Sequence, residues 1–226
     1  MNPEEFVRSV SLPFAMVVAS KRNSGKTQLV SQLIDQFVQQ GKIWLPVVYS
    51  ATAHLNDDYK FLPKRLVRPF DPGHLRDLMQ RQADTPKDQR KPILLVLDDL
   101  LSDNRATGNQ DILYAYAMGR HINIHPILIS QQANKILTPT VRNNADYFLL
   151  SRLNRQQLAE VWESICCLEK GEFIRFVELA NKDYTFVAID NTSNSNQPED
   201  FLKLVRADAT TLPRHKDWEQ ENLPGK

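Results

Sequence analysis

Short runs of mostly apolar residues alternate along the chain with longer amphipathic stretches. The apolar runs cover residues 14–20, 43–50, 92–101, 125–132 and 145–153. Apolar side chains at successive positions indicate strands that are buried on both faces, as the strands of a parallel sheet are. We therefore predict five strands of a mainly parallel central sheet.

The amphipathic stretches between these runs have the period of a helix. In residues 27–40 apolar side chains recur at helical spacing, and Gly41 ends the pattern. Further helices are predicted within residues 68–84, 109–123 and 155–170. A strand followed by a helix, several times in succession, predicts an α/β fold in which helices flank the sheet.

The last third of the chain has a different pattern. Residues 173–190 are predicted to form two strands around a turn at residues 181–183, and hence a C-terminal β-hairpin. From Asn191 onward most residues are polar, with few apolar anchors. We therefore predict one domain over residues 1–190 and a loosely packed tail over residues 191–226.

Composition limits the classes of protein that the chain could belong to. Hydrophobic residues make up 42% of the 226 residues, enough for a packed core, and a net charge of +1 gives no global attraction for nucleic acid. The adjacent Cys166 and Cys167 have no metal-binding spacing and favour a reducing compartment. The acidic N-terminus indicates no secretion signal, and no apolar run reaches the ~18 residues of a membrane-spanning segment.

The segment SKRNSGKT lies between the first predicted strand and the first predicted helix. It matches the P-loop pattern, in which backbone N–H groups and a helix N-terminus hold phosphates, except that Ser20 stands at the position of the first glycine. Lys26 is predicted to bind the β- and γ-phosphates of ATP, and the Thr27 hydroxyl to hold Mg²⁺. The predicted nucleotide-binding residues are Ser20, Lys21, Arg22, Asn23, Ser24, Gly25, Lys26 and Thr27.

Polar residues follow two other buried strands. LLVLDDL places Asp98 and Asp99 at the end of one of them, where Asp98 is predicted to hold Mg²⁺ and Asp99 to activate the attacking water. ILISQQ places Gln131 after the other strand, where an amide can sense the γ-phosphate and orient water. Gln132 competes with Gln131 for this role.

Four segments in this order and spacing carry a family resemblance: SKRNSGKT, LLVLDDL, GRHINIHPILISQQ and PTVRNNADYFLL. They resemble the genome-packaging ATPases of large DNA viruses of the poxvirus type and of virophages, which belong to the FtsK–HerA superfamily. The resemblance covers about residues 14–153. It implies a RecA-like P-loop NTPase with a mainly parallel central sheet, which uses ATP and Mg²⁺.

The resemblance also implies partners and a location. It implies a homo-oligomeric ring, double-stranded DNA that is pumped into a preformed capsid, and contact with a capsid or vertex protein. It implies a viral protein at the assembly site in the host cytoplasm, in the virion, or in both. In such rings an arginine of one subunit enters the site of the next, and the resemblance favours Arg120 or Arg142 for this catalytic role. His121 is predicted to be structural.

Contacts with DNA are poorly marked in the sequence. The candidate cations are Lys64, Arg65, Arg68, Lys135, Arg152 and Arg155. Other functions stay open: a plasmid or conjugative DNA pump of the same superfamily, a P-loop phosphotransferase that acts on a small molecule, and a nucleotide-binding scaffold without turnover.

Overall fold

The computed structural model describes residues 1–226 except 53–57, 101–108, 166–167, 196 and 209–226. The described strands form one eight-stranded sheet in the order β3-β2-β4-β5-β1-β6-β7-β8. The pairings from β3 to β6 are parallel, and β7 and β8 add an antiparallel end. In order along the sheet, the strands are β3 (Val67–Arg68), β2 (Leu45–Ser50), β4 (Ile93–Asp98), β5 (Ile124–Ser130), β1 (Met16–Ser20), β6 (Tyr147–Ser151), β7 (Thr185–Asp190) and β8 (Leu202–Arg206).

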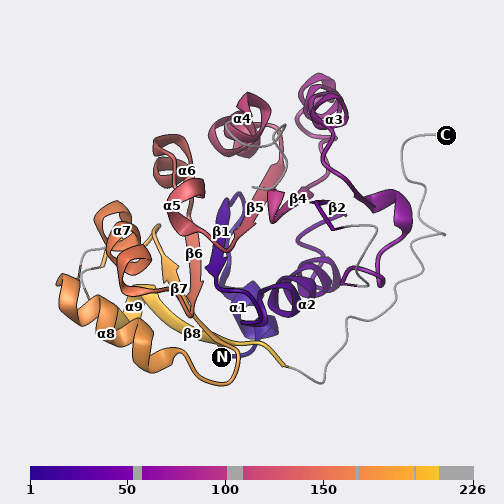
Figure 1. Ribbon diagram of the computed structural model, residues 1–226. Helices are drawn as coiled ribbons and strands as arrows, with labels where there is room; N and C mark the ends of the chain where they lie inside the picture. Colours follow the sequence, from indigo (N-terminus) through magenta and orange to yellow (C-terminus); the bar gives the residue numbers. More distant parts are fainter. Residues whose placement is uncertain (53–57, 101–108, 166–167, 196, 209–226) are drawn as a thin grey trace.

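Helices cover both faces of this sheet (Figure 1). One face carries α1 (Pro3–Ser9) and α2 (Lys26–Gln39), and the other carries α3 (Pro72–Asp84), α4 (Gln110–Met118) and α6 (Pro139–Asn144). The remaining described helices are α5 (Ala133–Ile136), α7 (Arg155–Ile165), α8 (Lys170–Ala180), α9 (Pro198–Phe201) and the 3₁₀ helices η1 (Lys64–Leu66) and η3 (Gly119–His121). The predicted α/β fold with a mainly parallel sheet between helices is confirmed.

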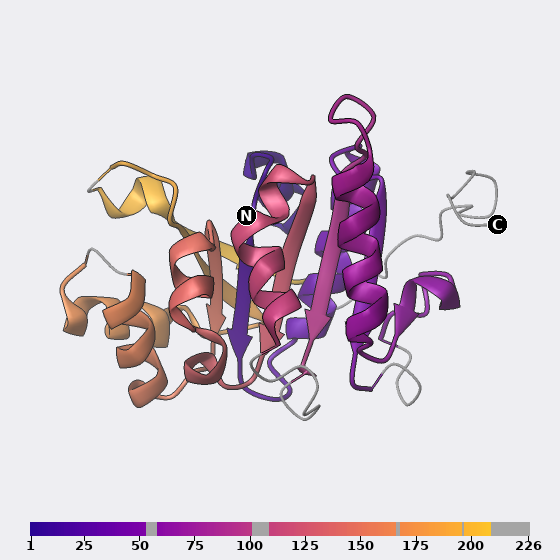
Figure 2. The same ribbon diagram turned by 90° about the horizontal axis from the view of Figure 1, so that it is seen from above.

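Figure 2 shows that the parallel strands run in one common direction. The arrows of β6, β1, β5 and β4 point the same way, so their carboxyl ends form one edge of the sheet. Every residue of these four strands is buried, as the continuous apolar runs predict for a parallel sheet covered on both faces. The buried core therefore holds the polar residues that end the strands at fixed positions along the carboxyl edge.

The structure corrects the first arm of the predicted hairpin. Residues 173–180 are not a strand but the end of α8, which begins after Glu169, whose side chain accepts a hydrogen bond from the Glu172 N–H. Phe173 and Val177, one helical turn apart, are buried on its inner face. The predicted C-terminal hairpin is present in the structure, but its two arms are β7 and β8.

Part of the predicted tail belongs to the sheet. Residues 198–206 form α9 and β8, and Phe201, Leu202 and Val205 are buried. β8 pairs with β7 from Leu202 to Arg206. The rest of the predicted tail, residues 209–226, lies outside the described residues. In the part of the chain that is described, no helix has the length and apolar character that crossing a membrane requires.

Candidate nucleotide-binding site

Three predicted site segments meet at the carboxyl edge of the sheet. Ser20 ends β1, Asp98 ends β4 and Ser130 ends β5, directly before Gln131. β5 lies between β1 and β4 and pairs with both in parallel. The strand order thus gathers the P-loop, the paired acids and the glutamine at one place.

Ser20 has a structural role where the P-loop pattern has its first glycine. Its side chain is fully buried, and its Oγ lies 2.6 Å from the Oγ of Ser24, which is also buried. The Ser24 Oγ is 2.7 Å from the carbonyl oxygen of Lys21. These hydroxyl contacts join the two ends of the loop, so the departure from the pattern adds an internal hydrogen bond to it.

Gly25 is required by both its backbone conformation and its surroundings. Its φ of +83° lies in the left-handed region, which L side chains rarely adopt. A Cβ atom at this position would lie 2.6 Å from Cδ1 of Tyr184. The aromatic ring of Tyr184, which comes from the segment before β7, therefore packs directly against the loop.

The N-terminus of α2 has the features of a phosphate site. Gly25 is the N-cap residue and makes no side-chain capping bond, so no side chain competes for the first N–H groups of the helix. These N–H groups and the helix dipole favour an anion. Lys26, the first residue of α2, is buried, and its charge lowers the pKa of Asp98, so the cation lies close to the acid.

Asp98 is a buried carboxylate with a specific partner. It is 5% exposed, and its Oδ2 accepts a hydrogen bond of 2.9 Å from the hydroxyl of Tyr59. Burial raises the pKa of Asp98 to about 6, although the bond from Tyr59 and the charge of Lys26 act in the opposite direction. Burial also raises the pKa of Tyr59 far above its ordinary value, so this hydroxyl is a permanent donor at neutral pH.

Asp99 faces Gln131. Its φ of +50° is left-handed, so the chain turns out of β4 at this residue. Its Oδ2 accepts a hydrogen bond of 2.5 Å from Nε2 of Gln131, and the Gln131 carbonyl in turn accepts from Gln157 of α7. The structure thus pairs Gln131 with the predicted water-activating acid, whereas Gln132 is exposed.

The donor set suits a magnesium ion. Mg²⁺ prefers hard oxygen ligands and binds through one or two protein groups together with substrate phosphates. A carboxylate whose pKa is raised by burial, as that of Asp98 is, gains from a nearby cation. Thr27 in the first turn of α2 and Asp98 would hold the ion, which supplies positive charge to the phosphates.

The two candidate arginines lie at the opposite edge of the sheet. Arg120 is in η3, before the amino end of β5, and its Nη2 donates to the carbonyl of Asn144 at 3.3 Å. Arg142 is in the last turn of α6, just before β6. The structure does not bring either residue to the P-loop of the same chain. His121 has an exposed side chain, and its carbonyl accepts from Arg90.

The candidate DNA-binding cations do not form one cluster. Lys135 and Arg152 follow β5 and β6 at the carboxyl edge and are exposed, whereas η1 and β3, which hold Lys64, Arg65 and Arg68, lie at the far end of the sheet. Arg155 forms an exposed ion pair of 2.8 Å with Glu178. Lys135 and Arg152 are therefore the candidates that share an edge with the P-loop.

Sequence reasoning missed two residues of the site. Tyr59 follows a predicted strand at no recognisable spacing, so only the fold reveals its bond to Asp98. Tyr184 lay in the predicted hairpin next to the turn, where a polar segment with one aromatic residue is a weak signal. Only the folded structure shows that Tyr184 contacts the loop at Gly25 and that Tyr59 bonds to Asp98.

Solved structures resemble this chain, whereas no protein-family model and no curated protein matches it. The genome packaging NTPase B204 of Sulfolobus turreted icosahedral virus 2, in complex with AMPPCP, has a TM-score of 0.60 and 18% identity over 90% of this chain and 98% of that one. B204, the DNA-packaging ATPase of Sulfolobus turreted icosahedral virus, has a TM-score of 0.58 with the same identity and coverage. The conjugation coupling protein TcpA of pCW3, with ATPγS, has a TM-score of 0.50 and 14% identity over 79% of this chain and 58% of that one. This likeness confirms the RecA-like P-loop NTPase fold.

Proposed function

We propose that this chain is a Mg²⁺-dependent ATPase of the FtsK–HerA superfamily that pumps double-stranded viral DNA into a preformed capsid. The observation that carries the proposal is the meeting of Lys26, Asp98 and the Asp99–Gln131 pair at one edge of the sheet. The similarity to viral packaging NTPases over nearly their whole length supports the packaging role.

The residues divide the work of hydrolysis. The loop N–H groups, the α2 N-terminus and Lys26 bind the phosphates and neutralise charge that develops on them. Asp99 accepts the proton of the attacking water, and Gln131 positions the Asp99 carboxylate through their hydrogen bond. Asp98 and Thr27 would hold Mg²⁺, which would supply positive charge to the phosphates. In a homo-oligomeric ring, Arg120 or Arg142 of a neighbouring subunit completes the charge stabilisation.

The ATPase part is tested by Lys26→Ala. We expect this change to reduce ATP turnover at least about 100-fold, because the phosphates lose their direct cation. Lys87→Ala, which removes an exposed lysine from the loop between α3 and β4, is the matched control and should keep full turnover. Unchanged turnover of the Lys26 variant would show that the loop does not bind phosphates.

The DNA part is tested by two measurements. ATP turnover should rise when double-stranded DNA of any sequence is added. A packaging motor holds phosphates and does not read bases, so log affinity should fall with log salt by about 0.9 for each phosphate neutralised. No stimulation by DNA, together with consumption of a small-molecule acceptor, would instead indicate a phosphotransferase. Binding to one short duplex sequence that survives high salt would also contradict a motor.

A plasmid or conjugative pump is the second candidate. The likeness to TcpA favours it, although the chain spans only 58% of that protein. Both candidates hydrolyse ATP and track DNA, so capsid binding separates them. We expect the chain to sediment with assembled empty capsids of its virus. Failure to bind such capsids, with DNA-stimulated turnover intact, would favour the plasmid pump. The same packaging role places the chain at the viral assembly site or in the virion.

A further inference from the structure

The arrangement of the site fixes the direction in which a bound nucleotide lies, if the proposed ATPase function holds. Asp98 ends β4, and Asp99 and Gln131 directly follow β4 and β5, so all three lie on one side of the P-loop, where they would face the γ-phosphate. The triphosphate is held along the loop between β1 and α2. The nucleoside therefore leaves the loop on its other side, toward β6 and β7.

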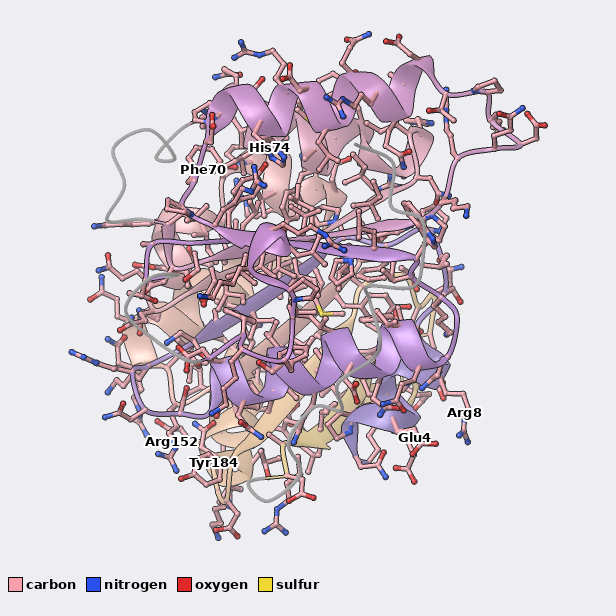
Figure 3. The ribbon with its side chains drawn as sticks, turned by 90° about the vertical axis from the view of Figure 1, so that its right-hand side faces the viewer. Glu4, Arg8, Phe70, His74, Arg152 and Tyr184 are labelled. Atoms are coloured by element: carbon pink, nitrogen blue, oxygen red, sulfur yellow. The ribbon has the colours of Figure 1, made fainter. Side chains whose placement is uncertain are left out.

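An exposed aromatic residue lies on that side. Tyr184 directly precedes β7, whose amino end shares the carboxyl edge of β6 because the two strands are antiparallel. Its ring packs on Gly25, but the residue remains 43% exposed. The guanidinium of Arg152, which directly follows β6, lies 6.0 Å from the ring centroid. Figure 3 shows Arg152 and Tyr184 side by side at one corner of the molecule.

The backbone holds both side chains at this position. Arg152, Asp183 and Tyr184 have left-handed φ values of +50°, +48° and +59°. The N–H of Arg152 donates to the side chain of Asn181 at 2.8 Å, and the Tyr184 carbonyl accepts from Ala207 at 3.1 Å. Non-glycine residues in this conformation carry strain that the surrounding structure must offset, and such strain gathers at ligand sites. The Arg152 guanidinium and the Tyr184 ring, held close together by strained turns, suit a ligand with a flat face.

We propose that Tyr184 and Arg152 form the nucleobase subsite, in which the base stacks on the Tyr184 ring beside the Arg152 guanidinium. Aromatic rings and guanidinium planes stack on bases of every kind, because each base has a π-face. The larger purine ring gains more from such stacking. The substrate class is thus purine nucleoside triphosphates, with ATP and GTP bound alike and pyrimidine nucleotides bound more weakly.

The test compares ligands with and without a base. Calorimetric Kd values are measured for ATP, GTP and inorganic tripolyphosphate, each with Mg²⁺. Tyr184→Ala should weaken ATP and GTP by about 10-fold or more and leave tripolyphosphate unchanged, because stacking on the ring is lost while the loop stays intact. Tyr184→Phe keeps the ring and should bind like the wild type. Tyr114→Ala removes a similarly exposed tyrosine from α4 and is the matched control.

Three results would overturn this subsite. The first is an unchanged Kd for ATP in Tyr184→Ala. The second is an equal loss of affinity for ATP and tripolyphosphate in that variant, which would mean that the ring only supports Gly25. The third is strong discrimination between ATP and GTP by the wild type. If Tyr184→Ala does not fold, Arg152→Ala provides the same comparison and should raise the Kd of ATP relative to that of tripolyphosphate. A wild type that binds neither ligand would overturn the proposed ATPase function as well, whereas Lys26-dependent binding of tripolyphosphate would uphold that function alone.

Discussion

Asp98 and Asp99 are neighbours in the chain but have different surroundings. Asp98 is the last residue of β4 and keeps the buried environment of the strand, in contact with Tyr59. Asp99 adopts a left-handed φ, so its carboxylate leaves the strand direction and reaches Gln131. One backbone angle thus gives the two neighbouring carboxylates different partners, Tyr59 for Asp98 and Gln131 for Asp99.

This difference predicts that the same substitution, aspartate to asparagine, has a different effect at each of the two positions. Asp98→Asn should raise the Kd of ATP in the presence of Mg²⁺ and have little effect without it, because it replaces a charged carboxylate ligand by a neutral amide. Asp99→Asn should leave Kd within about twofold and lower kcat at least about 100-fold, the usual contribution of a general base. Calorimetry gives the first quantity and steady-state turnover the second.

The wild type without Mg²⁺ is the reference for the first measurement. Equal losses of binding in both variants would show that the two carboxylates share the cation and that the roles are wrongly divided.

At the scale of elements, α4 is fastened to the strand that carries the P-loop. The hydroxyl of Tyr116 in α4 donates to the carbonyl of Met16 in β1 at 2.5 Å, and both residues are fully buried or nearly so. A buried hydroxyl in this position joins the outer helix to the centre of the sheet. It does so at the start of β1, away from the loop at the strand's other end.

Tyr116→Phe should therefore lower stability without changing the site. We expect the free energy of unfolding to fall by about 1–3 kcal/mol, because a buried carbonyl loses one of its partners. The Kd of ATP should stay the same, since the ring that fills the space is kept. Urea denaturation measures the first effect and calorimetry the second. Weaker binding of ATP by this variant would mean that the Tyr116–Met16 hydrogen bond also affects the geometry of the P-loop.

The elements also show how far the sequence predicts the fold. Strands β1, β2, β4, β5 and β6 and helices α2, α3, α4 and α7 follow from the apolar pattern, because burial on both faces or on one face leaves a distinct period. The prediction of a strand at residues 173–180 is wrong because the apolar residues of this segment suit either a strand or a helix, and packing on β6 and β7 favours α8. β8 is short and half-exposed, so its pattern is weak.

The same limit applies to the site. Lys26, Asp98, Asp99 and Gln131 could be placed from the sequence, because a strand end is a defined position even without a structure. The contacts of Tyr59 and Tyr184 could not, because they join segments that are 39 and 159 residues from their partners Asp98 and Gly25. The proposed roles of Arg120 and Arg142 would depend on a second subunit, whose position the sequence of one chain does not give.

At the scale of the whole molecule, His125 is a buried histidine near the amino end of β5, the second residue of that strand. This residue is fully buried, its Nδ1 lies 3.4 Å from the Phe14 N–H, and its Nε2 lies 3.1 Å from Oδ1 of Asn123. Its ring stacks on Phe14. Burial lowers the pKa of His125 to about 4, because the charged imidazolium loses its hydration.

His125 should make the protein less stable in acid. The unfolded chain takes up a proton near the ordinary pKa of 6.5 and the folded chain only near 4, so the contribution is complete above pH 6.5 and disappears as pH falls to 4. It amounts to about 3 kcal/mol. Urea denaturation at pH 7.5 and pH 4.5 measures it, and in His125→Asn this part of the pH dependence should vanish. Equal pH dependence in both proteins would show that the imidazole titrates normally.

The position of Arg120 and Arg142 away from their own P-loop predicts that activity depends on assembly. Mixing Lys26→Ala with Arg120→Ala, each inactive alone, should restore part of the ATP turnover, since some interfaces then join an intact P-loop to an intact arginine. Mixing Lys26→Ala with Asp98→Asn is the control, because no subunit of that mixture has a complete site. If assembly occurs without recovery for Arg120 and for Arg142, neither arginine acts between subunits.

The left-handed residues have a consequence for anyone who would make this protein more robust. Of the six described non-glycine residues with positive φ, five lie at the carboxyl edge: Asn23, Asp99, Arg152, Asp183 and Tyr184. Each such residue costs stability on the order of 1 kcal/mol, and glycine would remove much of that cost. A search for stabilising substitutions would therefore select this edge first and would remove the Asp99 carboxylate, the Tyr184 ring and the Arg152 guanidinium along with the strain. Heat resistance would therefore compete with the proposed site for the same few positions, and a more stable variant is better sought among the helices of the outer layers.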